Sequence, residues 1–175
     1  MSGHNKWSKI KNKKAASDAQ KSKIFGKLGK LLATESKLAK GDVNTPRMRT
    51  VIEKAKQANM PQDNINRAVQ KGKTDTASLE EVLYEAYGPG GVAIIIEGLT
   101  DSRNRTAQEI KHLLSKHDTA LAAPGAAVWA FEKTADGFEP KNTVPLLDFE
   151  REKLSNLVEA ILDHDDVQEV YTNEE

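Results

Sequence analysis

The sequence predicts an α+β protein in which an N-terminal three-helix module precedes a ferredoxin-like α/β sandwich. Apolar residues recur at spacings of three and four as far as Gly72, and then change to alternating or continuous runs. Charge reverses at the same place, because Met1–Asp75 has 18 Lys/Arg and 6 Asp/Glu whereas Thr76–Glu175 has 8 and 20. We therefore predict two domains, residues 1–75 and 76–175, with net charges of +12 and −12.

The first two predicted helices are amphipathic and have defined ends. One runs from about Ser17 to Lys40 with a single apolar stripe, and Gly41 ends it. Thr45 is expected to cap the second helix, which has a proline in its first turn and ends at Asn59.

Pro61 is expected to open the third helix. Its inner face consists of Ile65, Ala68 and Val69. Gly72 is a natural left-handed cap before a polar linker, so the module should end there.

The second domain begins with two predicted strands and a helix. The first strand starts near Val82–Tyr84 and the second spans Val92–Leu99, with a glycine-rich break between them. Asn104 or Thr106 can cap the following helix, and Thr106 with Glu109 matches a capping box.

The remaining elements complete the predicted sandwich. We expect strands at Ala126–Glu132 and Asn142–Leu147, joined by a turn at Thr134–Pro140. A helix capped by Asp148 and a last strand at Val167–Tyr171 follow. The order strand-helix-strand-strand-helix-strand from Val92 onward is the basis for the ferredoxin-like prediction.

Basic residues concentrate at the start of the chain, where Met1–Lys30 contains nine lysines and one acid, Asp18. Lysines neutralise phosphates, and an aromatic ring such as that of Trp7 can stack on an unpaired base. The same run is equally compatible with a solvated tail that has no specific partner. The candidate nucleic-acid-binding residues of this leader are Lys6, Trp7, Lys9, Lys11, Lys13, Lys14, Lys21, Lys23, Lys27 and Lys30.

Arg103 and Arg105 are the remaining candidates for nucleic-acid contact, and they lie in the acidic half. They can extend a phosphate track from the leader. They can equally pair with local carboxylates such as Asp101 and Glu109, in which case they contribute little. The sequence leaves both interpretations open.

Composition argues against catalysis and cofactor binding. The chain has no cysteine, and its four histidines form no metal-ligand pattern. The run His164-Asp165-Asp166 is interpreted as a water-exposed acidic turn, and Gly88–Gly91 as a tight turn between strands, because it lacks the Walker lysine and the GxGxxG spacing. We expect no metal, no other cofactor and no enzymatic activity.

A membrane role is a competing hypothesis, because a lysine-rich amphipathic helix can bind an anionic surface. The polar composition around Ile24, Phe25 and Leu28 argues against it, and the apolar run Val92–Ile96 is too short to span a bilayer. We expect a monomeric cytoplasmic protein.

Several separated motifs resemble one known family, the YebC/PmpR family. It includes bacterial proteins described as transcriptional regulators and mitochondrial translational activators of cytochrome c oxidase subunit I. The motifs, in chain order, are Gly3-His4-Asn5-Lys6-Trp7, Lys13-Lys14-Ala15-Ala16-Ser17-Asp18-Ala19, Lys23-Ile24-Phe25, Ala58-Asn59-Met60-Pro61, Tyr84-Glu85-Ala86-Tyr87-Gly88-Pro89-Gly90-Gly91, Asp101-Ser102-Arg103-Asn104-Arg105-Thr106 and Asp165-Asp166-Val167-Gln168-Glu169-Val170-Tyr171.

The resemblance covers nearly the whole chain but includes one departure. Family members usually carry a further α/β segment between the strand equivalent to Ala126–Glu132 and the last helix, and only Thr134–Pro140 stands there in this chain. We expect a shortened two-domain form in which Ala126–Glu132 and Asn142–Leu147 make a direct hairpin. The resemblance implies a nucleic-acid-binding regulator that acts on DNA in transcription or on ribosomal RNA and the ribosome in translation.

Overall fold

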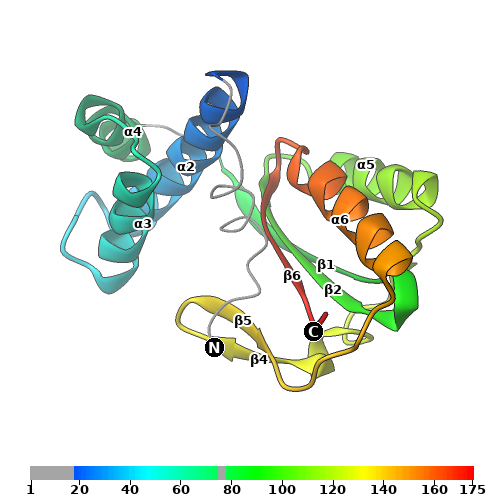
Figure 1. Cartoon of the computed structure of the whole chain (residues 1–175). Coiled ribbons are helices and arrows are strands. Elements are labelled where there is room, and N and C mark those ends of the chain that lie inside the picture. Colours follow the sequence, from blue (N-terminus) through cyan, green and yellow to red (C-terminus); the bar gives the residue numbers. More distant parts are fainter. Residues whose placement is uncertain (1–17, 75–77) are drawn as a thin grey trace. The chain divides into compact units, whose positions relative to one another are not determined.

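The computed structural model describes residues 18–74 and 78–175, which form two compact units (Figure 1). We call them the helical unit (residues 18–74) and the sheet unit (residues 80–175). Element labels follow Figure 1, in which the first described helix is α2. Each unit has its own hydrophobic core and is described by itself.

Three helices form the helical unit: α2 (Asp18–Leu38), α3 (Pro46–Gln57) and α4 (Gln62–Thr74). The predicted N-cap is confirmed, because the hydroxyl of Thr45 accepts a hydrogen bond from the backbone N–H of Met48. Asn59 has a φ of 58° and ends the α3 segment as expected. The inner faces meet in one core of buried apolar residues, namely Leu32, Met48, Val51, Ala55, Met60, Ile65, Ala68 and Val69.

The prediction for Gly72 is wrong, because this residue lies inside α4 instead of capping it. A Cβ at this position would come within 2.2 Å of the backbone oxygen of Ala33 and 2.8 Å of the Cβ of Ser36. Ser36 also donates a hydrogen bond of 2.7 Å to the carbonyl of Val69. The glycine is therefore required by the close approach of α4 to α2.

The sheet unit contains a four-stranded antiparallel sheet with two helices on one face (Figure 1). Its strands lie in the order β3-β1-β2-β6. Alternate residues of the strands pack against the helices in a core that includes Ile94, Ile96, Ile110, Leu114, Leu157, Ile161 and Val170. The bounds are β1 Glu80–Tyr87, β2 Ala93–Thr100, α5 Arg103–Lys116, β3 Leu121–Ala122, α6 Asp148–Leu162 and β6 Val167–Thr172.

A short hairpin covers part of the opposite face of the sheet. Its strands are β4 (Phe131–Thr134) and β5 (Gly137–Pro140), and a 3₁₀ turn at Val128–Ala130 leads into it. The Phe138 ring meets the Tyr171 ring edge to face, with centroids 5.4 Å apart. This contact belongs to a second core, made by Ala93, Ile95, Ala127, Ala130, Phe131, Phe138 and Tyr171.

The predicted α+β class is confirmed, but several strands are assigned differently. Ala126–Glu132 becomes the 3₁₀ turn and the start of β4, and the predicted turn Thr134–Pro140 contains β5. The expected direct hairpin between Ala126–Glu132 and Asn142–Leu147 is wrong, because β4 pairs with β5 within residues 131–140. Asn142–Leu147 contributes a single bridge between Val144 and Glu174. In this chain the central strands of the sheet are the pair β1 and β2, joined by the glycine-rich turn.

Two predicted helix starts are shifted. α5 begins at Arg103, three residues before Thr106, whose side chain is buried and contacts Asp166 instead of capping the helix. α6 begins with Asp148 as its first residue, and the carboxylate of Glu150 accepts a hydrogen bond from the backbone N–H of Leu147. Within the described residues, no helix has the length and apolar character that a membrane span requires.

Candidate nucleic-acid interface

The candidate interface is divided between described and undescribed parts of the chain. Lys6, Trp7, Lys9, Lys11, Lys13 and Lys14 lie outside the described residues. The remaining leader lysines, Lys21, Lys23, Lys27 and Lys30, all lie on α2. The helix therefore fixes the spacing of the second half of the predicted phosphate track.

Three of these lysines share one stripe of α2, because Lys23, Lys27 and Lys30 are four and three residues apart. Lys21 and Lys23 are exposed and Lys30 is half-buried. Lys27 is buried, with 7% of its surface exposed. Lys21, Lys23 and Lys30 are thus the described leader lysines with accessible surface for a phosphate.

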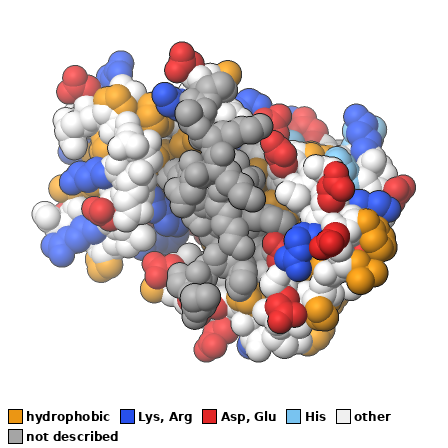
Figure 2. Space-filling view, in the orientation of Figure 1, with side chains coloured by type: hydrophobic (Ala, Val, Ile, Leu, Met, Phe, Trp, Pro, Cys, Tyr) orange, Lys and Arg blue, Asp and Glu red, His pale blue; other side chains and the backbone are white. Residues whose placement is uncertain are grey.

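Most of the positive charge of the helical unit lies outside the predicted leader lysines. Residues 18–74 contain 13 Lys/Arg and 5 Asp/Glu, so at least eight positive charges exceed what internal pairing can neutralise. Figure 2 shows Lys and Arg side chains recurring over α3 and α4 on the visible face of this unit. The basic residues that sequence reasoning left out are Lys37, Lys40, Arg47, Arg49, Lys54, Lys56, Arg67, Lys71 and Lys73. They are scattered in the sequence, and only the net charge of the whole segment points to them.

Folding brings some of these separated basic residues together. Gly41 has a φ of 82°, and a Cβ there would lie 2.3 Å from Cε of Lys73. The stem of Lys73, at the end of α4, therefore crosses the loop that follows Lys40. Arg47 has a different role, because it pairs at 2.7 Å with the buried carboxylate of Glu35 and ties α3 to α2.

In the sheet unit, Arg105 is held by carboxylates. Its guanidinium lies 2.7 Å from Oδ2 of Asp166 and 2.8 Å from Oδ1 of Asp101, with Glu109 at 3.9 Å. The hydrogen bonds that Arg105 donates to Asp166 and Asp101 raise its pKa above the ordinary value. The predicted local pairing with Asp101 and Glu109 is therefore present, and Asp166 is a third partner that the sequence did not indicate.

Arg103 also has local partners. Its Nε donates to Glu80 at 2.7 Å, and a guanidinium nitrogen donates to the carbonyl of Glu81 at 3.2 Å. Both side chains of the Arg103–Glu80 pair are more than half exposed. Arg103 and Arg105 therefore connect the start of α5 to β1 and to the residue preceding β6.

The turn His164-Asp165-Asp166 after α6 was predicted to be exposed to water, and this prediction is wrong for Asp166. Asp166 is buried, and its Oδ2 lies 2.8 Å from the hydroxyl of Thr106. His164 Nδ1 accepts from the backbone N–H of Asp166, and its Nε2 lies 2.8 Å from Glu109. Glu109, His164 and Asp166 offer ligand atoms within 4.8 Å of one another. Because Arg105 already supplies a positive charge to the two carboxylates, we assign this cluster to folding.

Glu85 is a buried carboxylate that sequence reasoning missed. It accepts backbone hydrogen bonds from Gly125, Ala127 and Val128 at 2.6, 2.7 and 2.8 Å. Burial alone would raise its pKa, but these three donors lower the pKa below the ordinary value. Glu85 thereby fixes the loop that leads to Trp129 and the β4–β5 hairpin.

The glycine-rich segment forms the turn between β1 and β2. Gly90 and Gly91 have φ values of 68° and 79°, and the N–H of Gly88 donates to the carbonyl of Val92 at 2.8 Å. A Cβ at Gly90 would come within 2.3 Å of Leu146. Chain reversal and close packing account for the glycines without a ligand.

Two family models match this chain along most of its length. The model described as the TACO1/YebC protein N-terminal domain matches residues 5–75. The model described as the TACO1/YebC second and third domain matches residues 79–136. The chain belongs to the TACO1/YebC family. This confirms the family inferred from the sequence motifs.

Similar proteins include curated relatives and a solved structure. A probable transcriptional regulatory protein of Thermosipho africanus is 40% identical and is matched over 99% of this chain and 93% of its own length. A protein of Fervidobacterium nodosum with the same description is 37% identical over the same shares. The crystal structure of a conserved hypothetical protein, Aq1575, from Aquifex aeolicus has a TM-score of 0.83 and 30% identity, covering 97% of this chain and 96% of that one.

This TACO1/YebC protein is a shortened form. The alignments with these two relatives run over 235 positions, although the chain has 175 residues, so the relatives contain internal residues that this chain lacks. The second family model stops at Asp136, in the turn of the β4–β5 hairpin.

Proposed function

We propose that this protein is a nucleic-acid-binding regulator of gene expression that binds the phosphate backbone through its Lys-rich leader and its helical unit. The observation that carries the proposal is the charge of the helical unit, with 13 Lys/Arg against 5 Asp/Glu in residues 18–74. An excess of this size on a small domain favours a polyanionic partner. The names of the relatives, probable transcriptional regulatory proteins, support a regulator.

Phosphate binding is favoured over base reading by the distribution of the charge. A helix that reads bases in the major groove places several polar side chains on one recognition helix. Here basic residues lie on α2, α3 and α4 alike. This pattern fits contacts to backbone phosphates, which fix position but carry no sequence information.

A second candidate function follows from the same distribution. Backbone contacts from several helices, together with Trp7 for stacking on an unpaired base, suit ribosomal RNA as well as duplex DNA. The alternative is therefore a ribosome-associated translation factor. Both candidates are binding functions, and neither requires catalysis or a cofactor.

Crosslinking in cells, with sequencing of the RNA and DNA fractions, distinguishes the two candidates. Promoter DNA peaks that disappear when Lys9, Lys11, Lys13 and Lys14 are changed to Glu would support a transcriptional regulator. Enrichment of ribosomal RNA that is lost in the same variant would support the translation factor. Absence of any nucleic acid that depends on these lysines would contradict both.

The described lysines need a binding assay with a charge-matched control. The variant K21E/K23E/K30E should weaken binding of purified full-length protein to duplex DNA at least tenfold, and lower the slope of log K against log salt by about 3. The control K111E/K116E/K153E makes the same change of net charge on exposed sites of the sheet unit. Equal weakening by both variants would show that net charge alone matters and would contradict the assignment to α2.

A further inference from the structure

One face of the central sheet is only partly covered by the hairpin. Strand pairing places Leu83, Glu97 and Glu169 side by side across β1, β2 and β6. The next row along, Glu85, Ile95 and Tyr171, provides two of the residues packed under the β4–β5 hairpin. Leu83 lies outside the three core clusters of the described residues and is 42% exposed.

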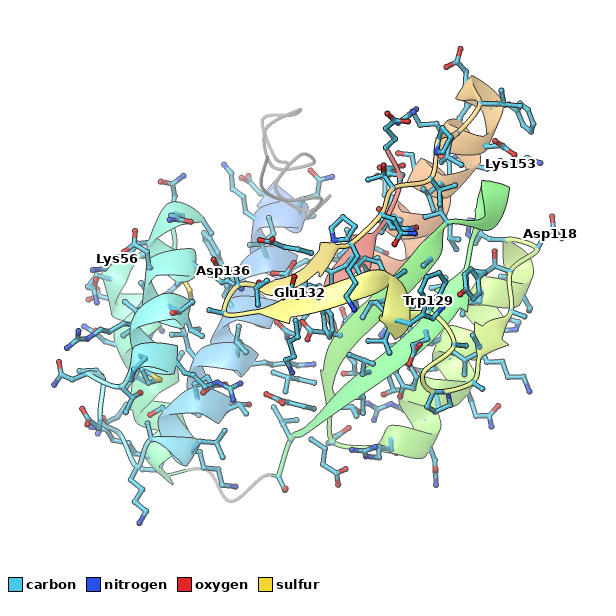
Figure 3. The ribbon with its side chains drawn as sticks, turned by 90° about the horizontal axis from the view of Figure 1, so that it is seen from below. Lys56, Asp118, Trp129, Glu132, Asp136 and Lys153 are labelled. Carbon is cyan, nitrogen blue, oxygen red and sulfur yellow. The ribbon has the colours of Figure 1, made fainter. Side chains whose placement is uncertain are left out.

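Negative charge converges on this face. The hydroxyl of Tyr171 donates to Oε2 of Glu97 at 3.2 Å. Burial raises the pKa of Tyr171, and the charges of Glu97, Glu169 and Asp136 raise it further, so the three carboxylates all act on one point. Figure 3 shows Asp136 at the tip of the hairpin, with Glu132 along β4. We define Leu83, Glu97, Glu169 and Asp136 as the carboxylate face.

The part of the Lys-rich leader that precedes α2, residues 1–17, has the chemistry that the carboxylate face would accept. Residues 1–17 contain five lysines and no Asp or Glu, and apolar Trp7 and Ile10 lie between the lysines. Two apolar side chains among several lysines match a row that places carboxylates beside an exposed leucine. The sheet unit's excess of acidic residues adds a long-range attraction for such a segment.

We propose that the Lys-rich leader docks on the carboxylate face and that nucleic acid displaces it. Docking then regulates nucleic-acid binding, because both use the same lysines. The regulatory part rests on the proposed function, because phosphates and carboxylates then compete for Lys6 to Lys14. A tethered segment has an effective concentration in the millimolar range, so even weak docking is populated. The docked fraction lowers the apparent affinity for nucleic acid in proportion.

Docking can be tested without nucleic acid, which separates it from the proposed function. The chain has no cysteine, so Ser8→Cys accepts a single paramagnetic label on the full-length protein. At low salt, the label should broaden the backbone amide signals of Leu83, Glu97 and Glu169 more than those of α6. The broadening should disappear in about 0.5 M salt, where the Debye length is only a few ångströms. Unbroadened signals at these three residues would overturn the proposal, as would broadening that persists in high salt.

The regulatory consequence is tested by neutralising the face in the full chain. The variant E97Q/E169Q/D136N keeps the size of each side chain and should bind duplex DNA three- to tenfold more tightly while losing the broadening. The control E152Q/E159Q/D118N removes the same charge from exposed sites elsewhere in the sheet unit. Equal tightening in both variants, or retention of the broadening in E97Q/E169Q/D136N, would overturn the role of these carboxylates.

A smaller variant guards against a folding defect. If E97Q/E169Q/D136N has an altered circular dichroism spectrum, E169Q/D136N leaves the Tyr171–Glu97 hydrogen bond intact. It should retain about half of the effect on broadening and affinity. A separate experiment adds an unrelated lysine-rich peptide that carries the paramagnetic label. If this peptide broadens the signals of Leu83, Glu97 and Glu169 while the label at Ser8→Cys does not, the assignment of the leader as occupant is overturned.

Discussion

The helical unit and the sheet unit use ionisable residues in different ways. In the sheet unit, buried carboxylates hold the fold: Glu85 accepts three backbone N–H groups, and Asp166 joins Arg105 to Thr106. In the helical unit, the Glu35–Arg47 pair has a comparable role, but Lys/Arg outnumber Asp/Glu by 13 to 5. The comparison indicates that the sheet unit uses these two carboxylates internally, whereas the helical unit carries an excess of positive charge that internal pairing cannot neutralise.

The largest effect should come from removing the Glu85 carboxylate. Glu85→Ala leaves three backbone donors without their acceptor, at least one of them buried, and should lower the free energy of unfolding of the sheet unit by about 3 kcal/mol. Urea unfolding followed by Trp129 fluorescence, in a Trp7→Phe background, measures this. Glu81→Ala, at the exposed start of the same strand, should change stability by less than about 0.5 kcal/mol. An equal effect of both variants would contradict the role of Glu85.

The helical unit has a matched pair of glycines that tests its packing. Gly72→Ala places a Cβ against the backbone of Ala33 and should destabilise the unit by about 2 kcal/mol. Gly29→Ala lies within α2, where no described atom is within 4 Å of the new Cβ, and should stabilise the helix by about 0.5–1 kcal/mol. Amide hydrogen exchange along α2 measures both. Destabilisation by Gly29→Ala would show that this face of α2 is packed.

The two arginines of α5 have carboxylate partners that differ in burial: Asp166, the partner of Arg105, is buried, and Glu80, the partner of Arg103, is exposed. Asp166→Ala removes the acceptor shared by Arg105 and Thr106, and should cost about 1–2 kcal/mol. Glu80→Ala removes an exposed ion pair with Arg103 and should cost less than about 0.5 kcal/mol. Urea unfolding in the same fluorescence background distinguishes them. Equal losses would mean that burial of Asp166 does not matter.

The smallest effect should be a pH dependence of the sheet unit. The folded-state pKa of Glu85 is below its ordinary value of 4.5, so the ionised form stabilises the fold. This contribution is present above pH 4.5 and is lost as the pH falls through the lower folded pKa. The stability difference between wild type and Glu85→Ala should therefore shrink in this range. A constant difference would contradict the lowered pKa.

Local patterns predicted the helices better than the short strands. Thr45 with Pro46, the stripe of α2 and the β1–β2 pair follow from local spacing, and all are present. β3 has two residues and β4 has four, too few for periodicity to identify. Gly72 was misplaced because a glycine required for helix packing resembles a terminating glycine in sequence.

The candidate site was predictable where charges are contiguous. The lysines of α2 stand out as a run, whereas Lys40 and Lys73 are brought near the same loop only by folding. Asp101 and Glu109 were foreseeable partners of Arg105 because they are four residues away on either side. Asp166 was not, since it is 61 residues away and reaches Arg105 through the order of strands in the sheet.

The salt dependence of nucleic-acid binding tests the central claim most directly. Affinity of the full-length protein for duplex DNA and for single-stranded RNA of the same sequence would be measured across about 50–200 mM salt. If about eight lysines meet phosphates, log K should fall with log salt at a slope near −7 on the duplex and somewhat less steeply on the single strand. A slope near zero on both would contradict phosphate binding by the leader and helical unit.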